Sequence, residues 1–299
     1  MNKILVGENL VKSFGEGDER RNVLDGVSVE INEGEFVAVM GPSGSGKSTL
    51  LFALSGMDGI DSGKVTFDGE DMSALGENEL ADMRRTEMGF VFQQPTLLRN
   101  LTILDNIILP SMRDRRANGA EITSKARALM KTTGVAELEN REITQASGGQ
   151  LQRVGICRAL MSDPKVIFGD EPTGALNSTS ASEVMNLLGE IHRNGTTILL
   201  VTHDARVAAR TERVLYLFDG KIAGEFLAGA YDEAVVLLAV IPLDQPALAP
   251  GLRQQTAAGR AMQRLGGVVQ FLLLAAPHKG DSAAGAVEDF VLVGWFGHG

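Results

Sequence analysis

Short apolar runs alternate with turn residues over the first forty positions of the chain. The runs are KILVGENLVKSF, VLDGVSVEI and GEFVAVM, and glycine or polar residues separate them. Short apolar segments bounded by such residues are typical of β-strands joined by tight turns. We therefore expect residues 1–40 to form strands.

The period of the apolar positions changes after Gly41. The stretch KSTLLFALSG has helical spacing and closes at Gly56, and GKVTFDGEDM then returns to a strand and a turn. Residues 75–140 are rich in charged and helix-forming residues, with SKARALMKTTG the clearest helix. Apolar residues three and four positions apart favour an amphipathic helix. This part of the chain is therefore expected to be largely helical.

From residue 165 the elements alternate. The order is a strand (KVIFGDE), a helix (SASEVMNLLGEIHRNG), a strand (TTILLVTH) and a pair of strands around RVLYLFDGKIAGE. Strands and helices that alternate at this length form parallel βαβ units, in which helices cover the sheet. The pattern predicts an α/β fold.

Composition divides the chain near residue 226. Only 10 of the 73 residues in 227–299 are charged, against 56 of the first 226, and this segment holds 14 alanines and 10 glycines. We expect residues 1–226 to form the working domain. Residues 227–299 are interpreted as a C-terminal extension, to which the sequence assigns no role.

Charge and cysteine usage restrict the class of protein. The formal net charge is −10, whereas proteins that bind nucleic acid nonspecifically need clustered Lys and Arg, so no nucleic-acid partner is expected. The single cysteine, Cys157, excludes an internal disulfide and fits a reducing compartment. The N-terminus does not resemble a secretion signal, and no apolar run reaches the ~18 residues of a membrane span. A cytoplasmic protein is expected.

The segment GPSGSGKST matches the P-loop pattern G-x-x-x-x-G-K-[ST], with a strand before it and a helix after it. Its glycines let successive backbone N–H groups point at phosphate oxygens, and the helix start adds a positive dipole end. We expect Lys47 to reach the β and γ phosphates and the Ser48 hydroxyl to ligate Mg²⁺. The alternative is a plain glycine- and serine-rich turn. The predicted nucleotide-binding residues here are Gly41, Pro42, Ser43, Gly44, Ser45, Gly46, Lys47, Ser48 and Thr49.

An apolar strand ending in Asp170 and Glu171 supplies the acidic half of the site. Asp170 is placed to hold the metal shell, and Glu171 to polarise an attacking water as a general base. The alternative is a solvated strand end. His203 ends the next strand, where it is expected to reach the γ-phosphate side of the site. Gln93 follows another short apolar strand and is expected to touch metal and water, although spacing alone does not choose between it and Gln94.

The stretch QASGGQLQRV places two adjacent glycines directly before a helix. One interpretation is a simple turn. The other is a second phosphate-binding surface, formed by Ser147 and by the N–H groups of Gly148 and Gly149 at the helix start. The residues alone leave both interpretations open.

Taken together, these motifs resemble those of the ATP-binding cassette (ABC) ATPases over residues 1–226. Six motifs occur in the family's order: the Walker A loop, Gln93 of the Q-loop, the signature Ser147–Gln150, Asp170 of Walker B, the adjacent glutamate Glu171, and the switch residue His203. The resemblance implies a P-loop NTPase fold with a RecA-like core, an antiparallel β subdomain and an α-helical signature subdomain at about residues 75–160. It also implies ATP and Mg²⁺ as cofactors, with Ser48, Gln93 and Asp170 as metal ligands.

The resemblance further implies a homodimer, in which each ATP lies between the Walker A loop of one chain and the signature of the other. In this arrangement a Cβ at the signature glycines is expected to hold the two backbones apart. Asn177 stands where the family's D-loop usually carries Asp, and Ala146 where the signature usually begins with Leu. Phe14 corresponds to the aromatic residue that stacks on adenine, and its alternative is a core residue of the first strand.

Within the family, the sequence is similar to that of cassettes for lipoprotein release and macrolide efflux. Its segment EPTGALNS most resembles the cassettes of bacitracin-type peptide resistance. A separate membrane permease is then the expected partner, with the chain bound peripherally at the inner face of the membrane. The alternative is a non-transporting regulatory cassette of the cell-division type. A P-loop kinase would have no use for the signature or for Glu171 beside Asp170.

Overall fold

The computed structural model describes residues 2–113, 118–227, 272–275 and 290–293, and its main body contains two sheets. The smaller sheet is antiparallel, with strand order β2-β1-β4-β5. Its first strand covers the whole of the first expected run, KILVGENLVKSF. The strands of this sheet are β1 (Lys3–Phe14), β2 (Arg21–Asn32), β4 (Ser62–Phe67) and β5 (Glu70–Asp71).

The larger sheet has six strands in the order β10-β9-β3-β8-β7-β6. Its neighbours from β9 to β6 are parallel, and β10 pairs antiparallel with β9. The parallel βαβ arrangement expected from the sequence is therefore confirmed. The strands are β3 (Phe36–Met40), β6 (Met88–Phe92), β7 (Val166–Asp170), β8 (Thr197–Val201), β9 (Arg213–Phe218) and β10 (Lys221–Leu227).

Helix α1 (Lys47–Leu54) packs between the two sheets, whereas α6 (Ser178–Arg193) and α7 (Ala205–Ala208) cover the other face of the larger sheet. Strand β3 serves both layers because successive side chains point to opposite faces. Val37 and Val39 join the cluster around α1, and Ala38 and Met40 join the cluster around α6. Every residue of β3 is buried, which explains why its sequence is continuously apolar.

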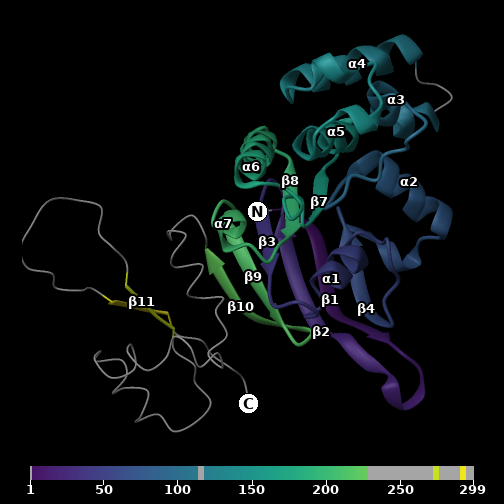
Figure 1. Cartoon of the computed structure of the whole chain (residues 1–299). Coiled ribbons are helices and arrows are strands. Elements are labelled where there is room, and N and C mark those ends of the chain that lie inside the picture. Colours follow the sequence, from purple (N-terminus) through teal and green to yellow (C-terminus); the bar gives the residue numbers. More distant parts are fainter. Residues whose placement is uncertain (1, 114–117, 228–271, 276–289, 294–299) are drawn as a thin grey trace, which may run out of the picture.

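A third apolar cluster holds together the helices α3 (Ile103–Ile108), α4 (Gly119–Thr132) and α5 (Gly148–Leu160), which lie at the top of Figure 1. Val154 and Cys157 of α5 pack into this cluster, while Ile156 and Ala159 of the same helix pack against the larger sheet. Helix α5 therefore joins the helical group to the sheet.

The stretch from about residue 75 to 160 is largely helical and also contains the short strand expected before Gln93. Residues 88–92 form β6 inside the larger sheet, and α2 (Glu77–Glu87) packs with Leu80 and Met83 against the cluster around α1. The separate helical cluster begins only at Leu97. Short 3₁₀ turns complete the body: η1 (Gly17–Glu19), η2 (Met72–Ala74), η3 (Leu109–Arg113), η4 (Ala136–Leu138) and η5 (Ile143–Gln145).

In the expected C-terminal extension, the structure describes two strands that pair antiparallel, β11 (Leu272–Ala275) and β12 (Phe290–Val293). The rest of residues 227–299, from 228 onward, lies outside the described residues. Among the helices of the described ranges, not one combines the length and the apolar character that crossing a membrane requires.

Candidate nucleotide-binding site

Four of the predicted motifs meet at one edge of the larger sheet. The loop that starts at Gly41 follows β3, His203 follows β8, Asp170 ends β7, and Gln93 follows β6. These strands are consecutive neighbours in the sheet, and their carboxyl ends point the same way. Ligands of open α/β sheets bind at this edge. The topology therefore brings together residues that lie up to 162 positions apart in the sequence.

The loop 41–46 leads directly into α1, and Lys47 is the first residue of this helix. The Lys47 side chain is only 8% exposed, and its Nζ donates a hydrogen bond to the Pro42 carbonyl oxygen at 2.8 Å. Burial lowers the pKa of Lys47, while the nearby charges of Glu171 and Asp170 oppose this shift. The ammonium is thus held in the loop with its charge only partly compensated, as a phosphate ligand requires.

The chemistry of the loop fits a phosphate group. The Ser45 hydroxyl is buried and has no hydrogen-bond partner in the described part of the chain. A buried hydroxyl without a partner costs free energy, so a site that supplies one is favoured. A phosphate oxygen inside this loop would satisfy it.

Strands β9 and β10 support the loop from behind. The Gly220 N–H, in the turn between these strands, donates to the Ser45 carbonyl oxygen at 3.2 Å. A Cβ at Gly41 would collide with the Leu217 carbonyl oxygen, which belongs to β9. Position 41 therefore needs glycine because the loop lies directly against a neighbouring strand.

The Ser48 hydroxyl donates to Asp170 Oδ1 at 2.8 Å, which joins the start of α1 to the end of β7. Hydroxyl and carboxylate oxygens suit Mg²⁺, which takes one or two protein ligands together with substrate phosphates and water. The described residues contain no group of three or more His, Cys, Asp or Glu arranged to hold a metal alone. The donor set thus fits a metal that binds together with a phosphorylated ligand.

Glu171 is held by its backbone and by its side chain. Its φ is +50°, a conformation that costs non-glycine residues about 1–3 kcal/mol, and its N–H donates to the Val201 carbonyl oxygen at 3.0 Å. Its Oε1 lies 2.7 Å from Nδ1 of His203. The Glu171 side chain is 18% exposed and the His203 side chain 67% exposed. A carboxylate oriented in this way can accept a proton from water at the edge of the sheet.

Gln93 lies against the loop that follows Glu171. A Cβ built on Gly174 would be 3.0 Å from Gln93 Nε2. Residue 92 pairs with Asp170 in the sheet, which brings the residue after each of them to the same edge. The structure thus places Gln93 beside the acidic pair, although its predicted role as a metal ligand stays a prediction.

Ser147 is the N-cap of α5 and forms a reciprocal capping box with Gln150. The Gln150 N–H donates to Ser147 Oγ at 3.3 Å, and the Ser147 N–H donates to Gln150 Oε1 at 2.8 Å. Ser147 and Gly148 are exposed, and Gly149 is buried. The hydrogen bonds described for Ser147 do not involve residues 41–49 of the same chain.

Gly149 is enclosed by its own chain. A Cβ at this position would lie 2.8 Å from Ser180 Oγ and 2.9 Å from Ser180 Cβ. The sequence predicts that a Cβ here would separate two dimer backbones, but Ser180 of the same chain is already too close to allow one. Ser180 stands in the first turn of α6, and its N–H donates to Oδ1 of Asn177, the N-cap of that helix. No motif marks Ser180, so the sequence offered no signal for this contact.

Phe14, the last residue of β1, is 49% exposed, which rules out the alternative that it is a core residue. The Lys12 ammonium lies 5.3 Å from the centroid of its ring. Ala146 packs with the helical cluster in place of a larger apolar residue. The aromatic face of Phe14 is thus on the surface, where a planar base could stack on it.

A glycine-rich loop that opens a helix beside a parallel sheet, with carboxylates at the neighbouring strand end, defines a P-loop nucleotide-binding protein. Comparisons with known proteins narrow this class. The profile of a family described as ABC transporter matches residues 24–174. The chain belongs to the ABC transporter family, as one of its ATP-binding cassettes.

Two curated relatives differ in how much of their length is matched. The lipoprotein-releasing system ATP-binding protein LolD 2 of Rhodospirillum rubrum is 44% identical over 223 residues, which cover 74% of this chain and 96% of that protein. The macrolide export ATP-binding/permease protein MacB of Neisseria meningitidis is 41% identical over 218 residues, which cover 73% of this chain and 34% of that protein. The chain thus spans about a third of the length of the macrolide-exporter relative.

Solved structures support the same fold. The ATP-binding cassette MJ0796, in a dimeric post-hydrolysis state bound to ADP and Pi, superposes with a TM-score of 0.71 at 38% identity and covers 76% of this chain and 100% of its own. The fold expected from the resemblance is confirmed. The finer assignment to the bacitracin-type peptide-resistance branch stays a prediction.

Proposed function

We propose that this chain is the ATP-hydrolysing subunit of a bacterial transporter whose permease is a separate membrane protein. The observation that carries the proposal is the meeting of Ser48, Asp170 and Glu171 at the phosphate loop, with Ser48 Oγ 2.8 Å from Asp170 Oδ1 and Glu171 Oε1 2.7 Å from His203 Nδ1. The match to an ATP-binding subunit over 96% of its length supports a separate permease.

In this proposal the phosphate loop binds the triphosphate through its backbone N–H groups and Lys47. Ser48 and Gln93 would ligate Mg²⁺, and Asp170 would hold its bound water; the metal would neutralise charge on the phosphates. Glu171 orients the attacking water and takes its proton. His203 fixes the rotamer of Glu171 through the contact between Nδ1 and Oε1.

The second half of the site is proposed to come from another copy of the chain. Ser147 and Gly148 are exposed at the start of α5, where their polar groups can bind the γ-phosphate of ATP held by a partner. The relative MJ0796 has been solved as a dimer with ADP and Pi. In the proposed homodimer, Asn177 would contact the partner chain close to the same interface.

A cavity of about 560 Å³ between the helical group and the larger sheet is the proposed docking place for the permease. Its lining includes Arg85 of α2, Phe90 of β6 and Pro110 of η3. Met112 of η3 is 62% exposed. An apolar surface with basic residues suits a short cytoplasmic segment of a membrane protein, which would place this chain at the inner face of the membrane.

The transported compound is proposed to be an antimicrobial peptide or a related antibiotic. This assignment rests on the resemblance of the segment EPTGALNS to cassettes of bacitracin-type peptide resistance. Among its relatives, one is named for macrolide export and one for lipoprotein release. A resistance exporter therefore fits both the sequence and its relatives.

Two substitutions test the hydrolytic part of the proposal. Lys47→Ala should weaken ATP binding by at least about 100-fold, because the ammonium that faces the phosphates is lost. Glu171→Gln should keep ATP affinity within about threefold and reduce turnover by at least about 100-fold, because only the proton acceptor is lost. Nucleotide affinity is measured by fluorescence titration and turnover by phosphate release.

Glu190→Gln is the matched control, since Glu190 is an exposed acid on α6 away from the site. Its variant should match the wild type in both measurements. Equal losses of ATP affinity in the Lys47 and Glu171 variants would contradict the role given to Glu171. Normal turnover in Glu171→Gln would contradict the proposed mechanism altogether.

A further inference from the structure

The hairpin that carries Phe14 has little apolar packing of its own. Phe14 ends β1 and pairs with Arg21, the first residue of β2, and η1 connects the two strands. Exposed hairpin ends are mobile unless polar contacts hold them. The position of the Phe14 ring therefore depends on what holds Ser13, which precedes it in the chain, and Arg20, which precedes its pairing partner Arg21.

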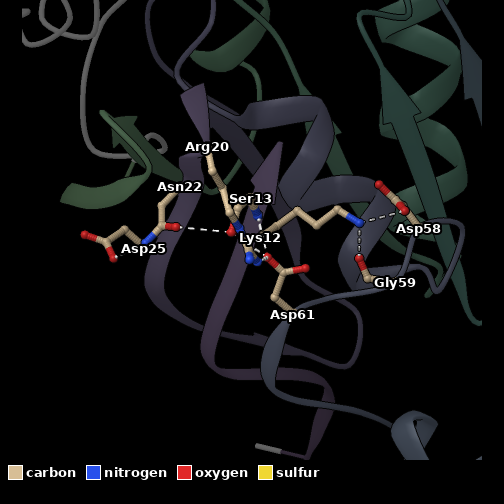
Figure 2. Close-up of polar contacts among 8 residues, drawn as sticks. All are labelled: Lys12, Ser13, Arg20, Asn22, Asp25, Asp58, Gly59 and Asp61. Atoms are coloured by element: carbon tan, nitrogen blue, oxygen red, sulfur yellow. Dashed lines mark hydrogen bonds and ion pairs between the residues drawn. The ribbon is translucent and has the colours of Figure 1, made fainter. Parts of the chain in front are cut away.

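A single carboxylate oxygen contacts both Ser13 and Arg20 (Figure 2). Oδ2 of Asp61 accepts hydrogen bonds from the Ser13 N–H at 2.9 Å, from the Ser13 hydroxyl at 2.5 Å and from Arg20 Nη2 at 3.1 Å. The Asp61 N–H donates to the Val11 carbonyl oxygen at 2.8 Å. Asp61 thus connects the end of β1 with the residue that precedes β2.

The protonation state of Asp61 suits this task. The Ser13 hydroxyl, followed by Arg20, lowers the pKa of the carboxyl group. The carboxylate is therefore ionised at neutral pH, and charge-assisted hydrogen bonds of this kind are stronger than neutral ones. Its contacts with the hairpin are present wherever the transporter would work.

Polar contacts also connect the hairpin with the phosphate loop. Asn22 Nδ2 donates to Asp25 Oδ1 at 3.1 Å, and Asp25 Oδ2 pairs with Lys221 Nζ at 3.0 Å. Lys221 follows Gly220, whose N–H donates to the Ser45 carbonyl oxygen. The hairpin and the loop that would bind the two ends of a nucleotide are thus parts of one connected framework.

We propose that Asp61 is a positioning residue for base recognition, which fixes the Phe14 ring at a set distance from the phosphate loop. This inference rests on the proposed function, in which Phe14 stacks on adenine. Asp61 does not touch the nucleotide itself. It stabilises the one hairpin geometry in which the base and the triphosphate are bound at the same time.

The test compares ATP with a ligand that has no base. In Asp61→Ala, KM for ATP should rise about tenfold, the size expected for losing a base–aromatic stack, while kcat stays within about twofold. The affinity for inorganic triphosphate, measured by its competition with ATP, should not change. Asp61→Asn keeps an oxygen that can accept from Ser13, and its KM should lie between those of the wild type and the alanine variant.

Two further variants make the result specific. Phe14→Ala should raise KM for ATP to a similar extent, and the double variant should be no worse than Phe14→Ala alone, because both changes remove one interaction. Asp71→Ala is the matched control: Asp71 caps η2 and pairs with Lys64 in the same sheet, without contacting the hairpin. Its KM for ATP should equal that of the wild type.

The outcomes distinguish the proposed role of Phe14 from the proposed role of Asp61. If Phe14→Ala leaves KM for ATP unchanged, the adenine role of Phe14 fails and the role of Asp61 fails with it. If Phe14→Ala raises KM and Asp61→Ala does not, only the role of Asp61 fails. Additive effects, or an equal loss of triphosphate affinity in Asp61→Ala, would show that Asp61 merely supports the fold.

Discussion

At the scale of single residues, Glu171 stores backbone strain at the point where hydrolysis is proposed to occur. Its φ of +50° is unfavourable for a residue with a Cβ, yet two contacts hold it, one from its N–H to Val201 and one from its side chain to His203. Strain of this kind persists where the surrounding structure imposes it, often at functional sites. The carboxylate is thereby oriented before any nucleotide binds.

Cys157, in contrast to Glu171, is a reactive group that its surroundings keep unreactive. Burial raises its pKa from 9.0 to about 11, although a nearby Thr133 hydroxyl, at 2.9 Å from Sγ, opposes the shift. The folded protein therefore holds the thiol proton more tightly than the unfolded chain. The stability from this group is fully present below pH 9 and is lost as the pH rises toward about 11.

We predict that Cys157 resists alkylation in the folded protein. At pH 9 the folded state should contain about 50-fold less thiolate than expected from an ordinary thiol, and burial blocks access as well. Iodoacetamide labelling followed by mass spectrometry should be slow in buffer and fast in urea. In parallel, the urea midpoint should fall between pH 9 and pH 11 more for the wild type than for Cys157→Ala, and equal slopes would contradict the raised pKa.

Residues that follow strands could be predicted from the sequence, and residues that meet across the fold could not. Asp170 and His203 each close an apolar run, and parallel pairing then requires their strand ends to lie at one edge. The contact between His203 and Glu171 needs their side chains to turn toward each other over 32 positions. Asp61 had no signal at all, since its partner Ser13 lies 48 positions away.

At the scale of elements, α5 packs against two parts of the fold, and its N-terminus is proposed to bind phosphate. One face lies in the helical cluster and another against the larger sheet, while its first turn presents Ser147. Arg153 of α5 pairs with Glu183 of α6, and Gly149 packs against Ser180 of α6. The helix that starts at the signature is thus fixed to the helix that starts at Asn177.

We predict that Gly149→Ala reduces stability through a clash within the chain. The added Cβ meets Ser180 at 2.8–2.9 Å, and overpacking of this kind costs about 1–3 kcal/mol. ATP turnover should fall because the first turn of α5 shifts. Urea unfolding and phosphate release measure the two effects.

Changes at position 180 show whether the clash is the cause. Ser180→Gly removes both atoms that the new Cβ would meet and should restore much of the stability of Gly149→Ala. Ser180→Ala removes only the hydroxyl, keeps its Cβ at the 2.9 Å position, and should restore less. Equal stability of the two double variants would contradict the proposed packing role.

The sequence predicted most elements, including the short strand before Gln93. The strands around the motifs and the helices α1, α4 and α6 follow their apolar period. The short apolar strand expected before Gln93 is β6, MGFVF. The sequence alone does not say which strand it pairs with, and its parallel pairing with β7 places it in the larger sheet.

At the scale of the whole molecule, each chain is proposed to carry two halves of different sites. Mixing two inactive variants tests this arrangement. A Lys47→Ala chain paired with a Ser147→Arg chain has one site that combines an intact phosphate loop with an intact signature. Random mixing of symmetric dimers should therefore recover about a quarter of the wild-type phosphate release.

The control mixture joins Lys47→Ala with Glu171→Gln. Both changes lie on the phosphate-loop side of the site, so neither site of the mixed dimer is complete and no recovery is expected. Recovery in the control would contradict the division of the site. Failure of the first mixture to recover, with mixed dimers verified by mass spectrometry, would contradict it equally.

The support of the phosphate loop by the β9–β10 turn has a consequence for regulation. Because Gly220 contacts Ser45 and β9 lies against Gly41, the loop and the turn form one structural unit. Thermodynamic coupling between two sites is reciprocal. Any molecule that binds the turn differently with and without nucleotide would change nucleotide affinity by the same factor as the nucleotide changes its own binding. Such a molecule, bound at the edge of the sheet opposite β6, would act on nucleotide affinity without any direct contact with ATP.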